Sequence, residues 1–272
     1  MNVSIQKPRA FSRDWVKKEV KEVSLLFAAL PAIPTLIFVL SVVLMNVMAP
    51  ILVVNHPVVA LDGGLIVSWV SFLGIDMIVK RFGPKAATTT MCLALFVNLC
   101  VYGILSALGG LTFLTGQISP VSLWLRDLAT GTGWWVLGAS TFAFLVSAII
   151  SNILHWIIRK KFSRSSRNKL GPFMVASWVS ATTAQIIDNL LFGFLFGYLF
   201  FNRVLGIPIT PGAIFGAVAV LTALEIVCHA IFTPLGHRLS ENWRKEGRGK
   251  EYLAAVGLDD YGDAVIPAAT IK

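Results

Sequence analysis

The sequence predicts an all-α integral membrane protein with six transmembrane helices and with both the N and the C terminus in the cytoplasm. Three observations predict this fold class: an apolar composition, six long apolar runs, and an alternating distribution of positive charge. Of the 272 residues, 56% are hydrophobic and 14% are charged, whereas soluble proteins have about 45–50% apolar and about 25% charged residues. Together with a mean hydropathy of +0.76, this excludes a disordered chain, a coiled coil and a secreted disulfide scaffold, and indicates lipid as the main solvent.

Six apolar runs are the basis for the number of helices. A bilayer core about 30 Å thick needs about 20 apolar residues of helix. Runs of about this length cover residues 31–54, 64–79, 86–108, 134–158, 173–200 and 212–235. Short polar segments such as 80–85 and 159–172 separate them, and Gly and Pro in these segments end one helix and permit the next. We therefore expect residues 31–236 to form one six-helix transmembrane domain.

Two segments flank this domain. The first segment covers residues 1–30. Its residues 1–22 carry six basic and three acidic side chains, with no apolar region or cleavage site of a removable signal peptide close behind them. Within this segment, residues 11–23 have the pattern of an amphipathic helix that lies in the membrane interface. Pro31 and Pro34 are expected to break this helix before the first span, and residues 237–272 are expected to form a cytoplasmic tail.

The positions of Lys and Arg predict the orientation. Counted over connections that alternate between the two sides of the membrane, 21 lie on one side and two on the other. Because positive charge stays on the cytoplasmic side during insertion, both termini are expected there and the number of spans must be even. The basic residues directly flank apolar spans and lack interleaved stacking aromatics, so we expect membrane lipids as partners and no nucleic acid.

Two acidic residues lie near the centre of predicted spans, where a charged side chain has a high free-energy cost. Asp188 and Glu225 fall deep inside the fifth and sixth runs, on the order of 20 Å from the helix starts. A charge at the centre of a span costs about 2.5–3.5 kcal/mol on insertion scales, so such residues normally face a cavity or a partner. Spacings of i, i+3 and i+4 place polar neighbours on the same helical face. The two resulting stripes are Gln185, Asp188 and Asn189 on the fifth run, and Thr222, Glu225 and His229 on the sixth.

If the two stripes face each other, they line a polar pocket near the middle of the membrane. The alternative is that both carboxyl groups are protonated and form hydrogen bonds across a helix interface, because burial disfavours the charged form. Hydrogen bonds between membrane helices are typically worth about 1 kcal/mol or less. The number of ionisable and amide groups at one depth therefore favours the pocket.

Other polar residues lie near the inner ends of spans. Asp76 lies one turn before Lys80 and Arg81, so it either pairs with them or acts as a gate or helix-end contact. Asn152 and His155 lie near the end of the fourth run, and His155 is expected to be a polar residue at the membrane interface. The segment 109–133 is expected to be a loop in the headgroup region with Trp124 as an anchor, with a lid or re-entrant element as the alternative.

Small residues predict close helix packing. They include Ala176, Ser180 and Ala184 on the fifth run, Gly193 with Gly197, and Gly212 with Gly216. A homodimer contact is the alternative that these rows leave open. The three cysteines, Cys92, Cys100 and Cys228, lie in apolar runs without CxxC spacing and are expected to be small buried hydrophobic residues.

An enzyme is not expected, because HExxH, GxSxG and Walker A patterns are missing from the sequence. Glu225 and His229 are four residues apart and could supply two metal ligands, but no third His or Cys at matching depth is evident. We therefore expect no catalytic residue, no metal and no cofactor.

Four segments together resemble the vitamin uptake transporter family, whose characterised members are queuosine precursor transporters. They are FLGIDMIVKRFGPKAA (72–87), SAIISNILHWIIRKKF (147–162), VSATTAQIIDNLLFGFLF (179–196) and LEIVCHAIFTPLGHRL (224–239). The resemblance implies a six-helix carrier in the bacterial cytoplasmic membrane that imports 7-cyano-7-deazaguanine or 7-aminomethyl-7-deazaguanine. On this basis Asp76 and Asp188 match the Asp residues of the second and fifth family spans. The chain differs from the family at Asn152, where Asp is frequent, and near Glu225, where Lys is frequent.

A guanine-type base also fits the residues themselves. Its edge presents two adjacent donors, which one carboxylate can accept together, and Asp188 or Glu225 can do this. Flat heterocycles stack on aromatic faces, and the candidates are Trp178, Phe192, Phe194 and Phe196. The expected partner is thus a small heterocyclic substrate, and the predicted substrate-binding residues are Asp76, Asn152, Gln185, Asp188, Asn189, Glu225 and His229.

The expected mechanism is alternating access. Proton coupling through Glu225, His229 or Asp188 is one hypothesis, and facilitated diffusion is equally compatible with the sequence. The alternative function is the substrate-binding subunit of an energy-coupling-factor importer, which needs a separate ATPase. The small residues Ala28 and Ala32 would suit such docking, although Pro31 interrupts the pair.

Overall fold

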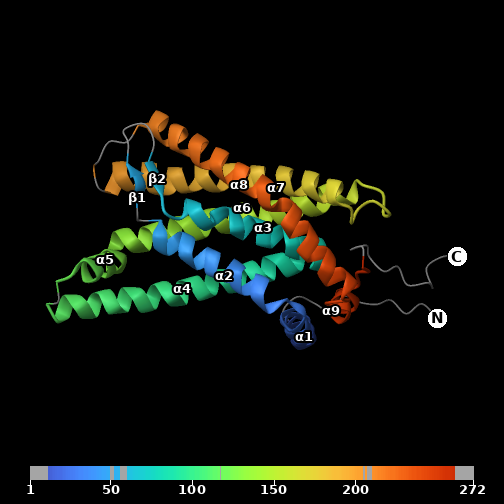
Figure 1. Ribbon diagram of the computed structural model, residues 1–272. Coiled ribbons are helices and arrows are strands. Elements are labelled where there is room, and N and C mark those ends of the chain that lie inside the picture. The colour runs from blue at the N-terminus through green and yellow to red at the C-terminus, as the bar shows by residue number, and fades with distance from the viewer. Residues whose placement is uncertain are drawn as a thin grey trace.

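The computed structural model describes residues 12–49, 52–55, 60–116, 118–204, 206 and 210–260. Long helices form a bundle (Figure 1): α2 (Ala32–Met48), α3 (Leu65–Phe82), α4 (Pro84–Leu114), α6 (Gly131–Lys160), α7 (Leu170–Phe192) and α8 (Pro211–Lys245). The π-helix η1 (Gly193–Val204) follows α7 directly. Shorter helices are α1 (Arg13–Ala29), α5 (Pro120–Ala129) and α9 (Lys250–Val256).

The bundle has two distinct ends. Helices α1 and α9 pack together at one end, which we call the α9 end (Figure 1). The opposite end, called the β1–β2 end, holds two short antiparallel strands, β1 (Leu52–Asn55) and β2 (Ala60–Asp62). Apart from these two short strands, the regular structure of the described residues is helical, in agreement with the predicted all-α class. The first apolar run was expected to be helical to residue 54, but α2 ends at Met48 and residues 52–54 belong to β1.

Each of the six apolar runs overlaps one of the long helices. In the part of the chain that the structure describes, four helices are long and apolar enough to cross a bilayer: α4, α6, α7 with the start of η1, and α8. Helices α1 and α2, bent by 106° against each other, provide a fifth if they form one broken span. Helix α3 carries Asp76, Lys80 and Arg81 within 18 residues and does not qualify on composition. The structure thus supports four to five spans, and the six-span topology stays a prediction.

Enclosure by other helices explains the composition of α3. It packs against α2, α4, α6, α7 and α8, and every residue from Ser71 to Gly83 is buried. Phe72, Ile75 and Phe82 belong to the main hydrophobic core. Because this part of α3 has no surface that faces outward, it does not need the apolar sequence that a lipid-facing helix needs.

The break between α1 and α2 lies where the prolines predicted it. The side chain of Ser12 caps α1 by accepting the backbone N–H of Trp15 at 3.2 Å. The helix ends at Ala29, and α2 begins directly after Pro31. Lys85 at the start of α4 forms ion pairs with Glu19 at 2.8 Å and with Glu22 at 2.6 Å, which hold α1 against the bundle.

Helix α8 is longer than the sixth apolar run, and the expectation for the cysteines was wrong. Helix α8 continues past residue 235, through Pro234, to Lys245, so the segment predicted as a tail from residue 237 starts as helix. Cys92 and Cys100 are exposed and Cys228 is half-buried. They occupy the outer surface of the bundle, where an apolar side chain faces lipid, and they do not fill the core.

The segment 109–133 is neither a loop nor a lid over the interior. Its first residues extend α4 to Leu114, and residues 120–129 form α5. Helix α5 packs on α4 and α6, with Trp124 and Leu128 against Tyr102 and Leu137. The prediction failed because residues around Gly109 allow two helices to approach closely, which the semi-apolar composition does not reveal.

Small residues also set the packing of η1 on α8. A Cβ atom at Gly193 would lie 2.9 Å from Ile214 Cγ2, and one at Gly197 would lie 3.5 Å from Ile214 Cγ1. The close packing predicted for this pair is therefore a contact within the chain.

The packing of α5 on α4 can be tested with two neighbouring glycines. A Cβ at Gly109 would lie 2.0 Å from the carbonyl oxygen of Leu125, whereas one at Gly110 would meet nothing within 4 Å. We expect Gly109→Ala to lower the free energy of unfolding by about 1–3 kcal/mol, because the two backbones must separate. Gly110→Ala has the same helix propensity gain and is expected to be neutral or stabilising. Thermal unfolding in detergent compares the two, and equal melting temperatures would contradict this packing.

Candidate functional site

Two groups of polar side chains lie among α3, α6, α7 and α8 at different depths. The first, called the Glu225 group, consists of Ser68, Asn189, Thr222 and Glu225. The second, called the Asp76 group, consists of Asp76, His155, Ser177, Ser180 and His229. Ser68 and Asp76 are eight residues apart on α3, so the two groups are separated by about 12 Å along that helix.

Glu225 is held by side chains of two other helices. Ser68 of α3 donates a hydrogen bond to Glu225 Oε1, and the amide of Asn189 on α7 donates to Glu225 Oε2 at 2.8 Å. The same amide donates to Thr222 Oγ1 at 3.0 Å. The Glu225 carboxyl group therefore connects α3, α7 and α8 at one point.

A hollow of about 50 Å³ adjoins the Glu225 group on the side of the β1–β2 end. It is lined by Met45, Ala49, Gly64, Ser68, Ser140, Asp188, Asn189, Phe192, Leu221 and Glu225. Asp188 borders it from α7 and accepts a hydrogen bond at 3.1 Å from Ser147 of α6. One water needs about 10–15 Å³, whereas small-molecule sites usually measure about 300–1,000 Å³. The hollow can hold a few waters, and a larger solute requires the surrounding helices to separate.

The Asp76 group lies deeper and is closed off from solvent. Asp76 is 0% exposed. Its Oδ1 lies 2.9 Å from His155 Nδ1, and its Oδ2 lies 3.3 Å from His229 Nε2. Ser177 of α7 donates to Asp76 Oδ2 and lies 2.8 Å from His229 Nε2. One buried carboxyl group thus joins α3 to α6, α7 and α8.

Several buried polar atoms near these two groups have no hydrogen-bond partner in the described part of the protein. They include both polar atoms of the Gln185 amide, Nε2 of His155 and Nδ1 of His229. Gln185 is 0% exposed and lies on α7 between Ser180 and Asp188, that is, between the two groups. Buried polar groups are nearly always hydrogen-bonded, to protein or to ordered water. Water between the two groups is the simplest partner for these atoms.

The Asp76 group has the composition of a hydrolase triad but not its geometry. In a triad, one imidazole nitrogen faces the carboxylate and the other faces the serine. Here Ser177 and Asp76 both approach Nε2 of His229, and Ser180 and Asp76 both approach Nδ1 of His155. Among the residues that the structure describes, no cluster of His, Cys, Asp and Glu side chains has the arrangement to hold a metal ion.

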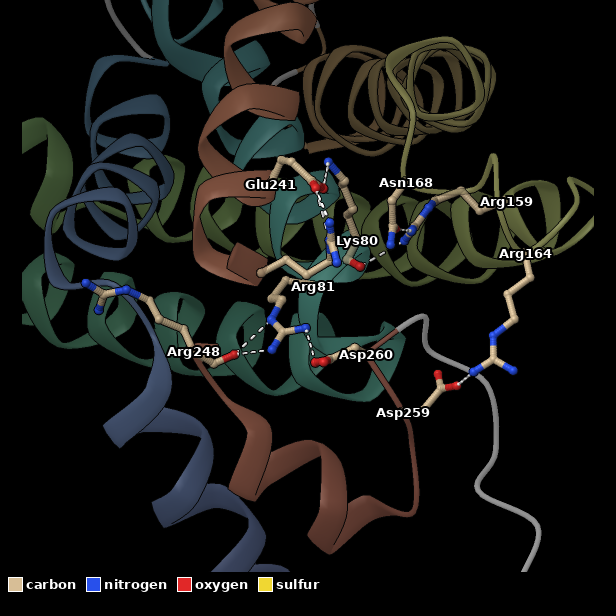
Figure 2. Close-up of polar contacts among 10 residues, drawn as sticks. Lys80, Arg81, Arg159, Arg164, Asn168, Glu241, Arg248, Asp259 and Asp260 are labelled. Atoms are coloured by element: carbon tan, nitrogen blue, oxygen red, sulfur yellow. Dashed lines mark hydrogen bonds and ion pairs between the residues drawn. The ribbon is translucent and has the colours of Figure 1, made fainter. Parts of the chain in front are cut away.

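Figure 2 shows a network of basic side chains and their partners at the α9 end of the bundle. Lys80 Nζ lies 2.9 Å from His237 Nδ1 and 3.7 Å from Glu241 Oε2. Arg159 donates to the carbonyl oxygen of Lys80 at 2.9 Å. Arg81 donates to the carbonyl oxygen of Arg248 at 2.8 Å and to Asp260 at 3.0 Å. We call this network the α9-end seal.

The structure brings some of the sequence-predicted site residues together and separates others. Asp188, Asn189 and Glu225 all border the hollow, so the two polar stripes do face each other at this depth. His229 lies on the same stripe as Glu225, but its side chain contacts Asp76 and Ser177. Gln185 is buried between the two groups and does not line the hollow.

The remaining predicted residues lie away from the hollow. Asp76 does not pair with Lys80 or Arg81, because both cations are held in the α9-end seal. His155 was expected at the membrane interface and is instead 0% exposed. The prediction for His155 was wrong because its distance from the end of α6 says nothing about the helices that cover it.

Asn152 donates to Thr88 of α4 at 3.0 Å. Of the four aromatic candidates, Phe192 lines the hollow, while Trp178 and Phe194 are exposed.

Serines are the functional candidates that the sequence reasoning missed. Ser68, Ser147 and Ser177 contact the three carboxyl groups, and Ser180 was predicted only as a small packing residue. The sequence contains an indication of their role, because four polar residues share one face of α7: Ser177, Ser180, Gln185 and Asp188. Serine is too frequent in membrane helices for this periodicity to identify it alone.

A helical membrane protein with buried carboxyl groups around an internal hollow has the features of a transporter. A family model described as "putative vitamin uptake transporter" matches residues 62–238. The chain therefore belongs to the putative vitamin uptake transporter family and is a multi-pass membrane protein. The matched region runs from the end of β2 into α8 and contains both polar groups. No curated protein and no solved structure matches the chain.

Two amide residues of α7 allow a test of the hydrogen-bond assignment. Gln185 has no partner in the described structure, whereas Asn189 donates to Glu225 and Thr222. We expect Gln185→Met to leave the melting temperature unchanged or to raise it, because it removes a buried polar group. Asn189→Leu is expected to cost about 1–3 kcal/mol, because it removes donors from a buried carboxyl group. Thermal unfolding in detergent measures both variants, and an equal loss would show that the buried Gln185 amide is hydrogen-bonded as firmly as that of Asn189.

Proposed function

We propose that this protein is a secondary carrier that imports a 7-deazaguanine, such as 7-cyano- or 7-aminomethyl-7-deazaguanine, across the bacterial cytoplasmic membrane. The observation that carries the proposal is the hollow beside Asp188 and Glu225 in a chain that belongs to a transporter family. A carrier of this kind needs no catalytic residue, metal or cofactor.

The chemistry of the hollow suits the base of this substrate. A guanine-type edge offers a ring N–H and an exocyclic amine side by side, and one carboxylate can accept both. Glu225 is already held by donors from Ser68 and Asn189, so a substrate with donors of its own can replace them without leaving the carboxyl group unpaired. Phe192 provides an aromatic face at the same hollow for a flat ring.

The charge distribution supports an orientation in which the hollow opens to the outside. Positive connections favour a cytoplasmic α9 end, where Lys80, Arg81 and Arg159 lie. The hollow then faces the outside, and the Asp76 group and the α9-end seal close the path to the cytoplasm. Six spans, with α3 as the enclosed second span, return both termini to the same side. Import requires that the seal opens after the substrate has entered, which is alternating access.

Ligand-induced stabilisation of purified protein tests the substrate. We expect 7-cyano-7-deazaguanine at about 100 times its dissociation constant to stabilise the protein by about 2.7 kcal/mol and to raise the melting temperature by several degrees. Glu225→Gln keeps the size of the side chain but removes the acceptor pair, so the shift should fall strongly. Glu251→Gln makes the same change on the exposed surface of α9 and should retain the full shift.

Two other experimental results would favour a different substrate or a different class of transporter. Stabilisation by a vitamin, without a response to any 7-deazaguanine, would contradict the proposed substrate while keeping the transporter class. An ATPase that copurifies in stoichiometric amount and is needed for uptake would favour the substrate-binding subunit of an energy-coupling-factor importer.

A further inference from the structure

The Asp76 group is a second ionisable site that the proposed substrate pocket does not use. It contains one carboxyl group and two imidazoles from α3, α6 and α8, and all three residues are at most 1% exposed. Neither His155 nor His229 lines the hollow. An inference about this group rests on the proposed function, because it concerns how a carrier of this kind is driven.

Hydrogen bonding defines where a proton can bind in this group. An ionised carboxylate only accepts hydrogen bonds, so each imidazole nitrogen that donates to it must carry a hydrogen. In the neutral histidines these are His155 Nδ1, 2.9 Å from Asp76, and His229 Nε2, 3.3 Å from Asp76. One further proton must then bind to His155 Nε2 or His229 Nδ1. These are the two ring atoms that lack a partner in the described structure.

Binding of one proton changes the net charge of the Asp76 group. With both histidines neutral and Asp76 ionised, the group carries one negative charge in a closed interior, which is expensive. One bound proton gives an imidazolium next to a carboxylate and a net charge of zero. A single proton therefore switches the group between a neutral ion pair and an uncompensated charge.

The surrounding charges differ on the two sides of the group. On α8, Glu225 lies one turn toward the β1–β2 end, and His237 lies two turns toward the α9 end. On α3 and α6, Lys80 and Arg159 each lie one turn toward the α9 end. Helix α7 contributes Ser177 and Ser180 and the ring of Phe173, which packs against His155. A proton is thus attracted from the side of Glu225 and repelled on the side of Lys80 and Arg159.

The Glu225 group and the Asp76 group both connect α3 and α7 to α8. Helix α3 reaches α8 through Ser68 and Glu225 at one level and through Asp76 and His229 at the other. Helix α7 reaches α8 at the same two levels, through Asn189 and through Ser177. A solute at Glu225 displaces the contacts at the first level, and a change of protonation alters those at the second. Movement of α8 away from α3 needs both contacts to change.

We propose that Asp76, His155 and His229 form a proton-binding site, separate from the substrate pocket, through which import is coupled to the proton gradient. One proton enters from the outside with each substrate, binds to the histidine pair beside Asp76, and leaves at the α9 end. Its release leaves the uncompensated negative charge of Asp76, which attracts the next proton from the outside.

Uptake into proteoliposomes that contain the purified full chain and a trapped pH dye tests this proposal with 7-cyano-7-deazaguanine as the probe. With the lumen one pH unit more alkaline, the wild-type protein should accumulate the probe about tenfold, since one pH unit corresponds to a factor of ten per coupled proton, and the lumen should acidify. Asp76→Asn should lose both the accumulation and the acidification. Asp127→Asn makes the same change on the exposed face of α5 and should keep both.

Binding separates this proposal from the proposed function. The probe should still raise the melting temperature of Asp76→Asn, because the hollow at Glu225 is intact, and it should fail to do so in Glu225→Gln. Wild-type uptake that is independent of the gradient and causes no acidification would overturn the proton site while the binding result stands. Gradient-driven accumulation by Asp76→Asn would overturn it equally.

A readout without substrate covers the case in which Asp76→Asn does not fold or no probe binds. Infrared difference spectra between pH 5 and pH 8 should show an imidazolium that loses its proton, and His155→Gln and His229→Gln should each reduce this signal. If neither variant changes the difference spectrum, no proton exchanges at this group and the proposal fails.

Discussion

A buried carboxyl group needs partners, and this requirement at Asp76 shapes the centre of the protein. Residues 71–82 of α3 are buried, so Asp76 lies away from bulk water and from the lipid headgroups. Histidines from α6 and α8 and serines from α7 surround it instead. Each of these helices must present one particular face to α3, and these faces also carry the residues of the Glu225 group. The position of the hollow is thus tied to the solvation of one aspartate.

The enclosure of α3 also explains why a test by composition finds four to five spans. Hydropathy reports how well a helix dissolves in lipid, and a helix surrounded by protein is not selected for that property. Lys80 and Arg81 are tolerated at the end of α3 because α8, the turn between α8 and α9, and the segment after α9 supply carbonyl and carboxylate oxygens (Figure 2). The same contacts form the α9-end seal. The residues that weaken the membrane signal of α3 are therefore the residues that close one end of the bundle.

Two polar levels on the same helices provide a physical basis for coupling. At the first level, Glu225 receives donors from α3 and α7; at the second, Asp76 receives them from α6, α7 and α8. Neither level can be opened without leaving a buried charge or dipole unsatisfied, unless a solute or a proton replaces the lost contact. Such an arrangement favours movement of α8 away from α3 when a solute and a proton occupy both levels together. Gln185, buried between the levels, has no hydrogen-bond partner in the described part of the protein.

The sequence by itself determined the positions of the long helices, the break at Pro31, and the depth of Asp188 and Glu225 on two polar stripes. These features are local, because helix length, proline geometry and the 3.6-residue period depend on neighbouring residues in the chain. The tertiary structure decided that His229 turns to Asp76 although Glu225 lies on the same stripe, that His155 is buried, and that α5 packs against α4. These features depend on how every helix is rotated against its neighbours. That rotation is fixed by packing and by the pairing of buried charges across helices, which no single helix encodes.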